Sequence, residues 1–163
     1  MPPAEDRILS AEVAPMSQDA ELMARCIELA RRSKDAGDFP FGSVITGPDG
    51  QVVAEGRNRE VTECDVSWHA EMAAIRNATR SLGTRDLRGH TLYASGEPCL
   101  MCAVAIRRAG ISRVVVGART KDPSPAGAHP FRTPEAFSDN PPPQVTWGVL
   151  EGDALLVQGR EAG

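Results

Sequence analysis

The sequence has only two lysines, no apolar run long enough to cross a membrane and no framework of paired cysteines. A membrane-spanning helix needs ~20 consecutive apolar residues, so an integral membrane protein is not expected. The first fifteen residues mix Pro, Glu, Asp and Arg and contain no apolar core of a secretory signal, so they are expected to form a loose tail. Four cysteines without regular spacing do not indicate a disulfide scaffold.

What remains is the composition of an ordinary globular domain. Hydrophobic residues at 41% and charged residues at 25% allow a substantial core, and 163 residues suffice for one domain but not for two ordinary ones. We expect a tail over residues 1–16 and a single domain over residues 17–163. The net charge of −4 argues against a nucleic-acid partner, because a phosphate backbone is usually met by a basic surface.

Helical and strand-like segments alternate along the chain, which predicts an α/β fold. A Pro-rich stretch over 120–144 is long for a connection inside a domain and is expected to be a functional loop or lid. The expected elements, in chain order, are a helix over 19–34, strands over 41–46 and 51–55, a helix over 69–82, a strand over 91–94, a helix over 99–109, strands over 113–118 and 145–149, and a helix over 151–158.

Residues of the types that bind zinc stand in two short motifs, His69-x-Glu71 and Pro98-Cys99-x-x-Cys102. A catalytic zinc site uses three imidazole or thiolate ligands and keeps a fourth position open to water. Two cysteines three residues apart place both sulfurs on nearly the same side of a helical turn. His-x-Glu followed by Pro-Cys-x-x-Cys is also the signature of zinc-dependent base deaminases. We therefore expect His69, Cys99 and Cys102 to hold one zinc ion.

Glu71 is expected to carry protons rather than to bind the metal. It lies two residues from His69, which on a continuous helix would place the two side chains on roughly opposite sides, so the spacing makes it a poor fourth ligand. Zinc lowers the pKa of a water molecule from ~15.7 to ~7. A nearby carboxylate can then move the proton to a ring nitrogen and to the leaving ammonia, which makes Glu71 the expected catalytic residue.

Simpler interpretations stay open for each motif taken alone. Cys-x-x-Cys also occurs in structural zinc sites and redox pairs, and His-x-Glu is common by chance. A structural site usually has four protein ligands, and the nearest further candidate, Cys64, lies in a polar stretch. Cys26, on the apolar face of the first helix, is expected in the core. With two of four cysteines assigned to zinc and no disulfide framework, a cytoplasmic protein is expected.

From about Ala20 to Leu156, the order helix, hairpin, His-x-Glu helix, strand, Pro-Cys-x-x-Cys helix, strand resembles the cytidine deaminase-like superfamily. The resemblance implies a three-layer α/β fold with a five-stranded mixed sheet flanked by helices, zinc between two helix amino-ends, and a homodimer. Histidine as the first ligand resembles the branch of guanine deaminases, tRNA adenosine deaminases and fungal cytosine deaminase. Glu97 before Pro98 resembles the first two more than the third.

The same resemblance implies several substrate contacts. Asn58 is expected to reach the substrate through its amide, although Asn also suits a turn. Phe41 is expected beside the substrate ring, although burial in the core explains a strand Phe equally well. The backbone N–H of Ala70 is similarly placed to bind a substrate carbonyl. Other expected contacts do not come from the resemblance: Trp68 stands where close relatives usually carry smaller residues, and structural burial explains it about as well, while His129 and Phe131 are expected from the Pro-rich loop. Pro98, beside the first cysteine of its motif, is the last expected contact.

Together these expectations predict an enzyme that hydrolytically deaminates an exocyclic amine on a free nucleobase or similar heterocycle and releases ammonia. A guanine-like base is the first expected substrate. The partner is then a small molecule, with neither nucleic acid nor membrane involved. A tRNA-specific adenosine-to-inosine deaminase is the alternative, and it predicts a basic channel. A noncatalytic, zinc-stabilised interaction domain is an alternative of another class, and it predicts bound metal without turnover.

Overall fold

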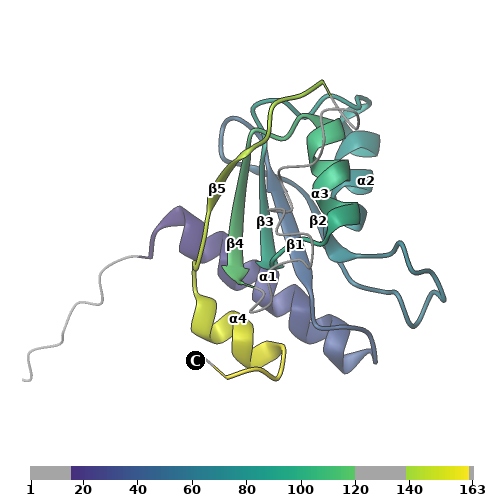
Figure 1. The fold of residues 1–163 in the computed structure, drawn as a ribbon, viewed down its shortest axis with the longest axis vertical. Helices are drawn as coiled ribbons and strands as arrows, with labels where there is room; N and C mark the ends of the chain where they lie inside the picture. The colour runs from purple at the N-terminus through teal and green to yellow at the C-terminus, as the bar shows by residue number, and fades with distance from the viewer. Residues whose placement is uncertain (1–15, 120–138, 162–163) are drawn as a thin grey trace, which may run out of the picture.

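The computed structural model describes residues 16–119 and 139–161, so the expectations for the tail, for His129 and for Phe131 fall outside the described residues (Figure 1). The described elements are α1 (Gln18–Asp35), β1 (Gly42–Thr46), β2 (Val52–Arg57), α2 (Ala70–Leu82), β3 (Thr91–Gly96), α3 (Leu100–Ala109), β4 (Arg113–Ala118), β5 (Gln144–Thr146) and α4 (Glu151–Val157). None of the described helices is long and apolar enough to cross a membrane.

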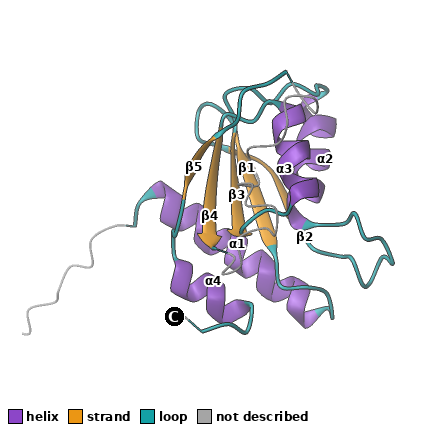
Figure 2. Cartoon of the chain, in the orientation of Figure 1, coloured by secondary structure: helices purple, strands orange, loops and turns teal. Residues whose placement is uncertain are grey.

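The five strands form one mixed sheet in the order β2-β1-β3-β4-β5. Strand β1 pairs antiparallel with both β2 and β3, while β3–β4 and β4–β5 are parallel pairs. Helices α2 and α3 cover one face of the sheet, and α1 and α4 cover the other (Figure 2). The structure thus confirms the expected three-layer α/β fold.

Side chains that alternate along the central strands supply a separate core to each face. Ile45 and Leu92 point into the core beneath α2 and α3, whereas their neighbours Val44 and Tyr93 point into the core beneath α1 and α4. The three consecutive valines of β4 alternate in the same way, and all three are fully buried. A strand buried on both faces is apolar throughout, which is why this run is so easily recognised in the sequence.

Local signals place most element ends within two residues of the expected positions. The Ser17 side chain caps α1 by accepting from the N–H of Ala20 at 3.2 Å, and α3 ends at Gly110, whose φ is +76°. Strand β5 is the exception, because it is shorter than the strand expected over 145–149. The chain turns out of the sheet after Thr146, with positive φ at Gly148 and at Leu150, and enters α4.

The two motif segments meet because α2 and α3 both begin at the same end of the sheet. His69 is the N-cap of α2, and Cys99 is the N-cap of α3, three residues after the end of β3. Gly56 in β2 lets the first turn of α2 approach closely, since a Cβ at that position would collide with the carbonyl oxygen of Ala70. The carbonyl end of one strand and the amino ends of two helices therefore meet at one point.

Candidate active site

Three side chains converge into a set of donor atoms of the right size for zinc. Nδ1 of His69 lies 3.6 Å from Sγ of Cys99 and 3.6 Å from Sγ of Cys102, and the three donor atoms all lie within 4.8 Å of one another. Tetrahedral zinc with bonds of ~2.3 Å to sulfur and ~2.0 Å to nitrogen requires a nitrogen–sulfur separation of about 3.5 Å. The residues present therefore fit zinc, and among the described residues no fourth protein ligand joins them.

The ends of the helices favour negative charge at this point. N-cap positions leave backbone N–H groups without helical partners, and the positive end of the helix dipole lies there. Hydrogen bonds from Cys102 and then from His69 lower the pKa of Cys99 to about 4, against the opposing effect of burial. The bond to Cys99, together with burial, raises the pKa of Cys102. A metal ion takes both as thiolates.

Glu71 points toward the donor set although it binds no metal there. Its side chain is almost fully buried, and its Oε2 accepts a hydrogen bond from Sγ of Cys102 at 3.4 Å. Burial raises the pKa of the Glu71 carboxyl, which suits a group that takes up and returns a proton. The expectation that it lies opposite His69 on one helix is wrong, because His69 is an extended N-cap residue that precedes the helix.

A cavity of about 340 Å³ opens beside these groups. Of the substrate contacts expected from the sequence, Phe41, Asn58 and Ala70 line it, whereas Pro98 and Trp68 do not. Pro98 is buried between two lining residues. The residues that line the cavity are Phe39, Phe41, Asn58, Glu60, His69, Ala70, Glu71, Glu97 and Cys99.

Asn58 is buried and rigidly held, so the orientation of its side chain is defined. Its backbone N–H donates to the carbonyl of Phe41 at 3.1 Å, and its carbonyl accepts from Oγ of Ser33 at 2.9 Å. Its side-chain Oδ1 accepts the N–H of Glu60 at 3.0 Å, which leaves the amide nitrogen as the donor toward the cavity. Asn58 therefore closes the turn through its Oδ1 and also lines the cavity, and its contact with the substrate stays a prediction.

Phe41 is positioned by a close approach at the end of β3. A Cβ added at Gly96 would lie 2.7 Å from the Phe41 ring, so only glycine leaves room for the ring there. The ring is partly exposed and faces the cavity together with Phe39. Phe41, which directly precedes β1, therefore lines the cavity and does not belong to either buried core cluster.

Trp68 lies in a neighbouring arginine-lined hollow, not in the cavity. Its ring lies between two guanidinium groups, 5.9 Å from that of Arg59 and 5.0 Å from that of Arg76. This hollow, of about 420 Å³, runs along the edge strand β2 between α1 and α2. The expectation that Trp68 forms a wall beside the substrate is therefore corrected: Trp68 lines the hollow rather than the cavity, and cation–π contacts with Arg59 and Arg76 hold its ring there.

Sequence reasoning missed three residues of the cavity: Glu97, which entered only through the family resemblance, and Glu60 and Phe39, which did not enter at all. Glu60 places Oε2 3.3 Å from Nε2 of His69, on the side of the ring that faces away from the cysteines. Phe39 is 49% exposed at the cavity mouth. No periodicity or motif identifies Glu60 or Phe39, because their positions depend on how the loops after α1 and β2 fold back against α2.

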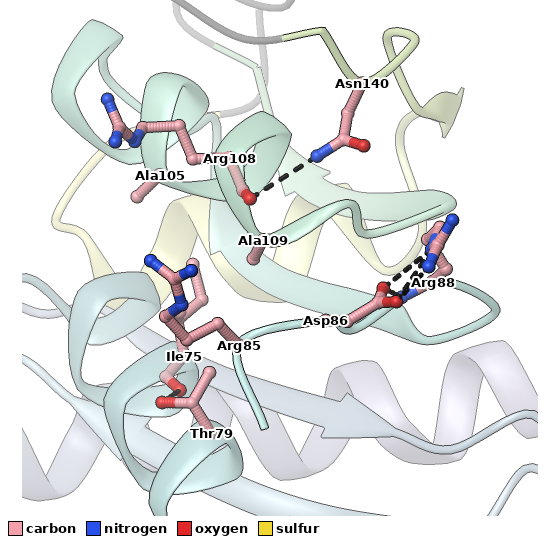
Figure 3. A pocket seen from close by; sticks show the side chains of 9 residues that line it. All are labelled: Ile75, Thr79, Arg85, Asp86, Arg88, Ala105, Arg108, Ala109 and Asn140. Atoms are coloured by element: carbon pink, nitrogen blue, oxygen red, sulfur yellow. Dashed lines mark hydrogen bonds and ion pairs between the residues drawn. The ribbon is translucent and has the colours of Figure 1, made fainter. Parts of the chain in front are cut away.

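A larger hollow of about 610 Å³ lies at the other ends of α2 and α3 and has a different character (Figure 3). Arg85, Arg88 and Arg108 surround an apolar floor that includes Ile75 and Ala109. It contains none of the three donor residues, and basic side chains at helix carboxyl ends are explained by the helix dipole. Size alone therefore does not identify the functional site here.

The profile of the cytidine and deoxycytidylate deaminase zinc-binding region matches residues 16–118. A tRNA-specific adenosine deaminase of Haemophilus influenzae is 33% identical over 132 residues, which cover 81% of this chain and 76% of that protein. A guanine deaminase of Bacillus subtilis is 42% identical over 106 residues, covering 64% and 67%. A tRNA(Ile)-lysidine synthase of Deinococcus deserti is 37% identical over 148 residues, but this chain spans only 27% of its length.

Solved structures give the same picture. A tRNA deaminase that edits adenosine to inosine at the wobble position superposes with a TM-score of 0.75 at 33% identity, covering 84% of this chain and 98% of that one. The guanine deaminase of Nitrosomonas europaea superposes with a TM-score of 0.71 at 28% identity, covering 86% and 82%. The matched region contains both motifs and all three donor residues. The chain therefore belongs to the cytidine and deoxycytidylate deaminase family and is one of its zinc-dependent members.

Proposed function

We propose that this protein hydrolytically deaminates an exocyclic amine on a free nucleobase or similar heterocycle, guanine-like above all, and releases ammonia. The observation that carries the proposal is the lining of the cavity beside the donor set. Three carboxylates, those of Glu60, Glu71 and Glu97, line a space of about 340 Å³, and no lysine or arginine of the described residues lines it. A cavity of this size is at the small end of the range for ligand sites.

The charge of this cavity favours one kind of substrate. Carboxylates accept hydrogen bonds, so they suit a planar ring that carries several N–H donors, as guanine does. A phosphate held against the same walls would meet like charge at short range, which is unfavourable. Phe39 and Phe41 provide the apolar surface against which such a ring can pack. An uncharged, amine-bearing heterocycle therefore fits the walls better than a nucleotide does.

Under this proposal, Glu71, Asn58 and Ala70 each have a role in the reaction. When bound, zinc activates a water molecule as the nucleophile by lowering its pKa. Glu71, whose side chain is buried, takes up the proton that the water loses and delivers it to the ring nitrogen. It then moves the proton of the new hydroxyl group on the ring carbon to the amine, which leaves as ammonia while the carbonyl forms. The amide nitrogen of Asn58 and the N–H of Ala70, at the start of α2, donate to acceptors on the ring.

A second candidate, deamination of adenosine in tRNA, is favoured by the arginine-lined hollow. Its walls carry Arg32, Arg57, Arg59, Arg76 and Arg80 with a single carboxylate, Glu55. Arg59 follows Asn58 directly and Trp68 precedes His69 directly, so this basic surface adjoins the cavity. Trp68 is partly exposed in this hollow, and basic side chains around an accessible aromatic ring are typical of sites that bind single-stranded nucleic acid. The net charge of −4 therefore does not describe the surroundings of the site.

One assay separates these candidates. Ammonia release is measured from guanine, cytosine, adenine, cytidine, amino-substituted triazines and a tRNA anticodon stem-loop, each with the same zinc-loaded protein. The proposal expects turnover of a free base and little of the stem-loop. Efficient, salt-sensitive deamination of the stem-loop without turnover of any free base would establish the second candidate. Bound zinc without turnover of any substrate would favour a noncatalytic interaction domain.

A homodimer is also proposed, and it has its own measurement. Leu100, at the start of α3 and one residue from Cys99, is 63% exposed, which is a large exposure for an apolar side chain beside an active site. A second copy that covers this end of α3 would bury it. Light scattering during gel filtration is expected to give twice the monomer mass, and Leu100→Glu is expected to give the monomer.

A further inference from the structure

The two ring nitrogens of His69 face different partners. Nδ1 lies 3.6 Å from each of the two cysteine sulfurs, and Nε2 lies 3.3 Å from Oε2 of Glu60. The side chains of His69 and Glu60 are 28% and 25% exposed, so both are largely withdrawn from water. The ring is thus placed between the donor set and a carboxylate that belongs to neither motif of the sequence.

We propose that Glu60 is a positioning residue that holds His69 in the one tautomer able to bind the metal. A neutral imidazole carries its proton on one nitrogen and its lone pair on the other. A carboxylate at Nε2 keeps the proton there, which leaves the lone pair on Nδ1, the nitrogen that faces the sulfurs. The negative charge also makes the ring a stronger donor. This inference rests on the zinc site of the proposed function, but not on the identity of the substrate.

Hydrogen bonds within the loop that carries Glu60 fix the position of this residue. The N–H of Glu60 donates to Oδ1 of Asn58 at 3.0 Å, and its carbonyl accepts from the N–H of Asp65 at 3.1 Å. The loop is closed where the N–H of Arg59 donates to the carbonyl of Trp68, again at 3.1 Å. The Glu60 carboxylate is therefore delivered by a backbone with fixed ends, as a partner that orients a ligand requires.

The buried carboxylate of Asp38 stabilises this loop by accepting three hydrogen bonds from it. Its Oδ1 accepts the N–H groups of Val61 and Thr62 at 3.0 and 2.8 Å, and its Oδ2 accepts the Thr62 hydroxyl at 2.8 Å. These bonds hold the two residues that directly follow Glu60. By contrast, the other buried carboxylate of the site, Glu71, bonds to Cys102 rather than to Nε2 of His69. Glu60 is therefore the carboxylate placed to orient the ring.

The test measures zinc affinity directly, by competition with a chromophoric chelator, for the parental protein and for Glu60→Ala and Glu60→Gln. Glu60→Ala is expected to weaken zinc binding by about 10- to 100-fold. Glu60→Gln, which keeps the shape and one acceptor oxygen, is expected to show a smaller loss. The matched control is Glu63→Ala, since Glu63 lies in the same loop, pairs with Arg59 and is 41% exposed. It is expected to bind zinc as the parental protein does.

A second readout reports the tautomer itself. Nitrogen NMR of the zinc-loaded protein is expected to show a slowly exchanging proton on Nε2 of His69, and faster exchange in Glu60→Gln. Parental zinc affinity in both Glu60 variants would overturn the proposal. If Glu60→Ala does not fold, the isosteric Glu60→Gln still decides. Neither measurement uses a substrate, so an error in the proposed substrate does not affect the outcome.

Discussion

Two pockets of opposite character lie on either side of one loop. Within residues 16–119 and 139–161, the cavity beside the donor set presents three carboxylates and neither lysine nor arginine, while the neighbouring hollow presents five arginines and one carboxylate. Adjacent residues divide between them, because Glu60 faces the cavity whereas Arg59 lines the hollow. The path of this loop therefore places acidic and basic side chains in two neighbouring pockets. The net charge of the whole chain cannot reveal this separation.

This sorting bears directly on the substrate. A free heterocycle needs only the acidic cavity, whereas a polynucleotide would place its base in the cavity and its phosphates along the hollow. The relatives include both tRNA adenosine deaminases and guanine deaminases, so they do not decide between these uses. The tests below ask which of the two pockets the chemistry requires.

The largest effect is expected from loss of a metal ligand in the cavity. Cys102→Ala removes one of three donors, so the bound zinc, about one per chain in the parental protein, should be lost together with all turnover. Metal analysis by mass spectrometry measures this. Cys64→Ala is the control, because Cys64 is exposed and lies outside the donor set. Full zinc retention in Cys102→Ala would remove that residue from the metal site.

Glu71→Gln is expected to slow turnover by ~10²-fold or more while zinc stays bound. Gln keeps the size of the side chain but cannot take up and return a proton, and Glu71 is not among the three donors. Steady-state ammonia release and metal content are measured on the same preparation. Turnover within a few-fold of the parental value, on the substrate found by the assay panel, would show that another group moves the proton.

The loop between the two pockets is expected to lose stability when Asp38 is replaced. Asp38→Ala leaves the backbone N–H groups of Val61 and Thr62 without their carboxylate acceptor, which should lower the free energy of unfolding by about 1–3 kcal/mol in urea denaturation. Asp38→Asn, which keeps an acceptor for both groups, should lose less. An equal loss in the two variants would mean that the charge, rather than the hydrogen bonds, braces the loop.

The same carboxylate predicts a pH dependence. Burial raises the pKa of Asp38, but bonds from Thr62 and Val61 and the nearby charge of Arg57 outweigh it, so the pKa is lowered on folding. Its contribution to stability is therefore complete above ~3.9, the usual pKa of an unfolded Asp. The contribution disappears as the pH falls through the lower folded value. The difference in stability between the parental protein and Asp38→Ala should shrink over that acidic range.

The smallest effect on a free base is expected from the hollow. Replacing Arg59 and Arg76 together by Ala removes both guanidinium groups that contact the Trp68 ring, yet neither residue lines the cavity. Turnover of the free base should change by less than about 2-fold, in line with surface changes away from the chemistry. If tRNA is the substrate, turnover of the stem-loop should fall sharply and depend less on salt.

Much of the site follows from local patterns. Three donors of the right types at the right spacing predict zinc, and the alternation of helices and strands predicts the layers in which they are held. The three valines of β4 predict a buried strand because each side chain is apolar. Gly110 predicts the end of α3 because glycine readily adopts a positive φ. Such features can be predicted from the sequence because they depend on neighbouring residues and not on residues far along the chain.

The sequence by itself determined the family and the three residues placed to hold the metal, because these depend on residue type and short spacing. Only the tertiary structure decided that Glu60 lies against Nε2 of His69, that the Trp68 ring packs between two arginines, and that acidic and basic walls lie on opposite sides of one loop. The physical reason is that a loop has no periodicity. The direction of each of its side chains is set by backbone hydrogen bonds to distant residues such as Asp38, and these bonds form only when α1, β2 and α2 have packed together.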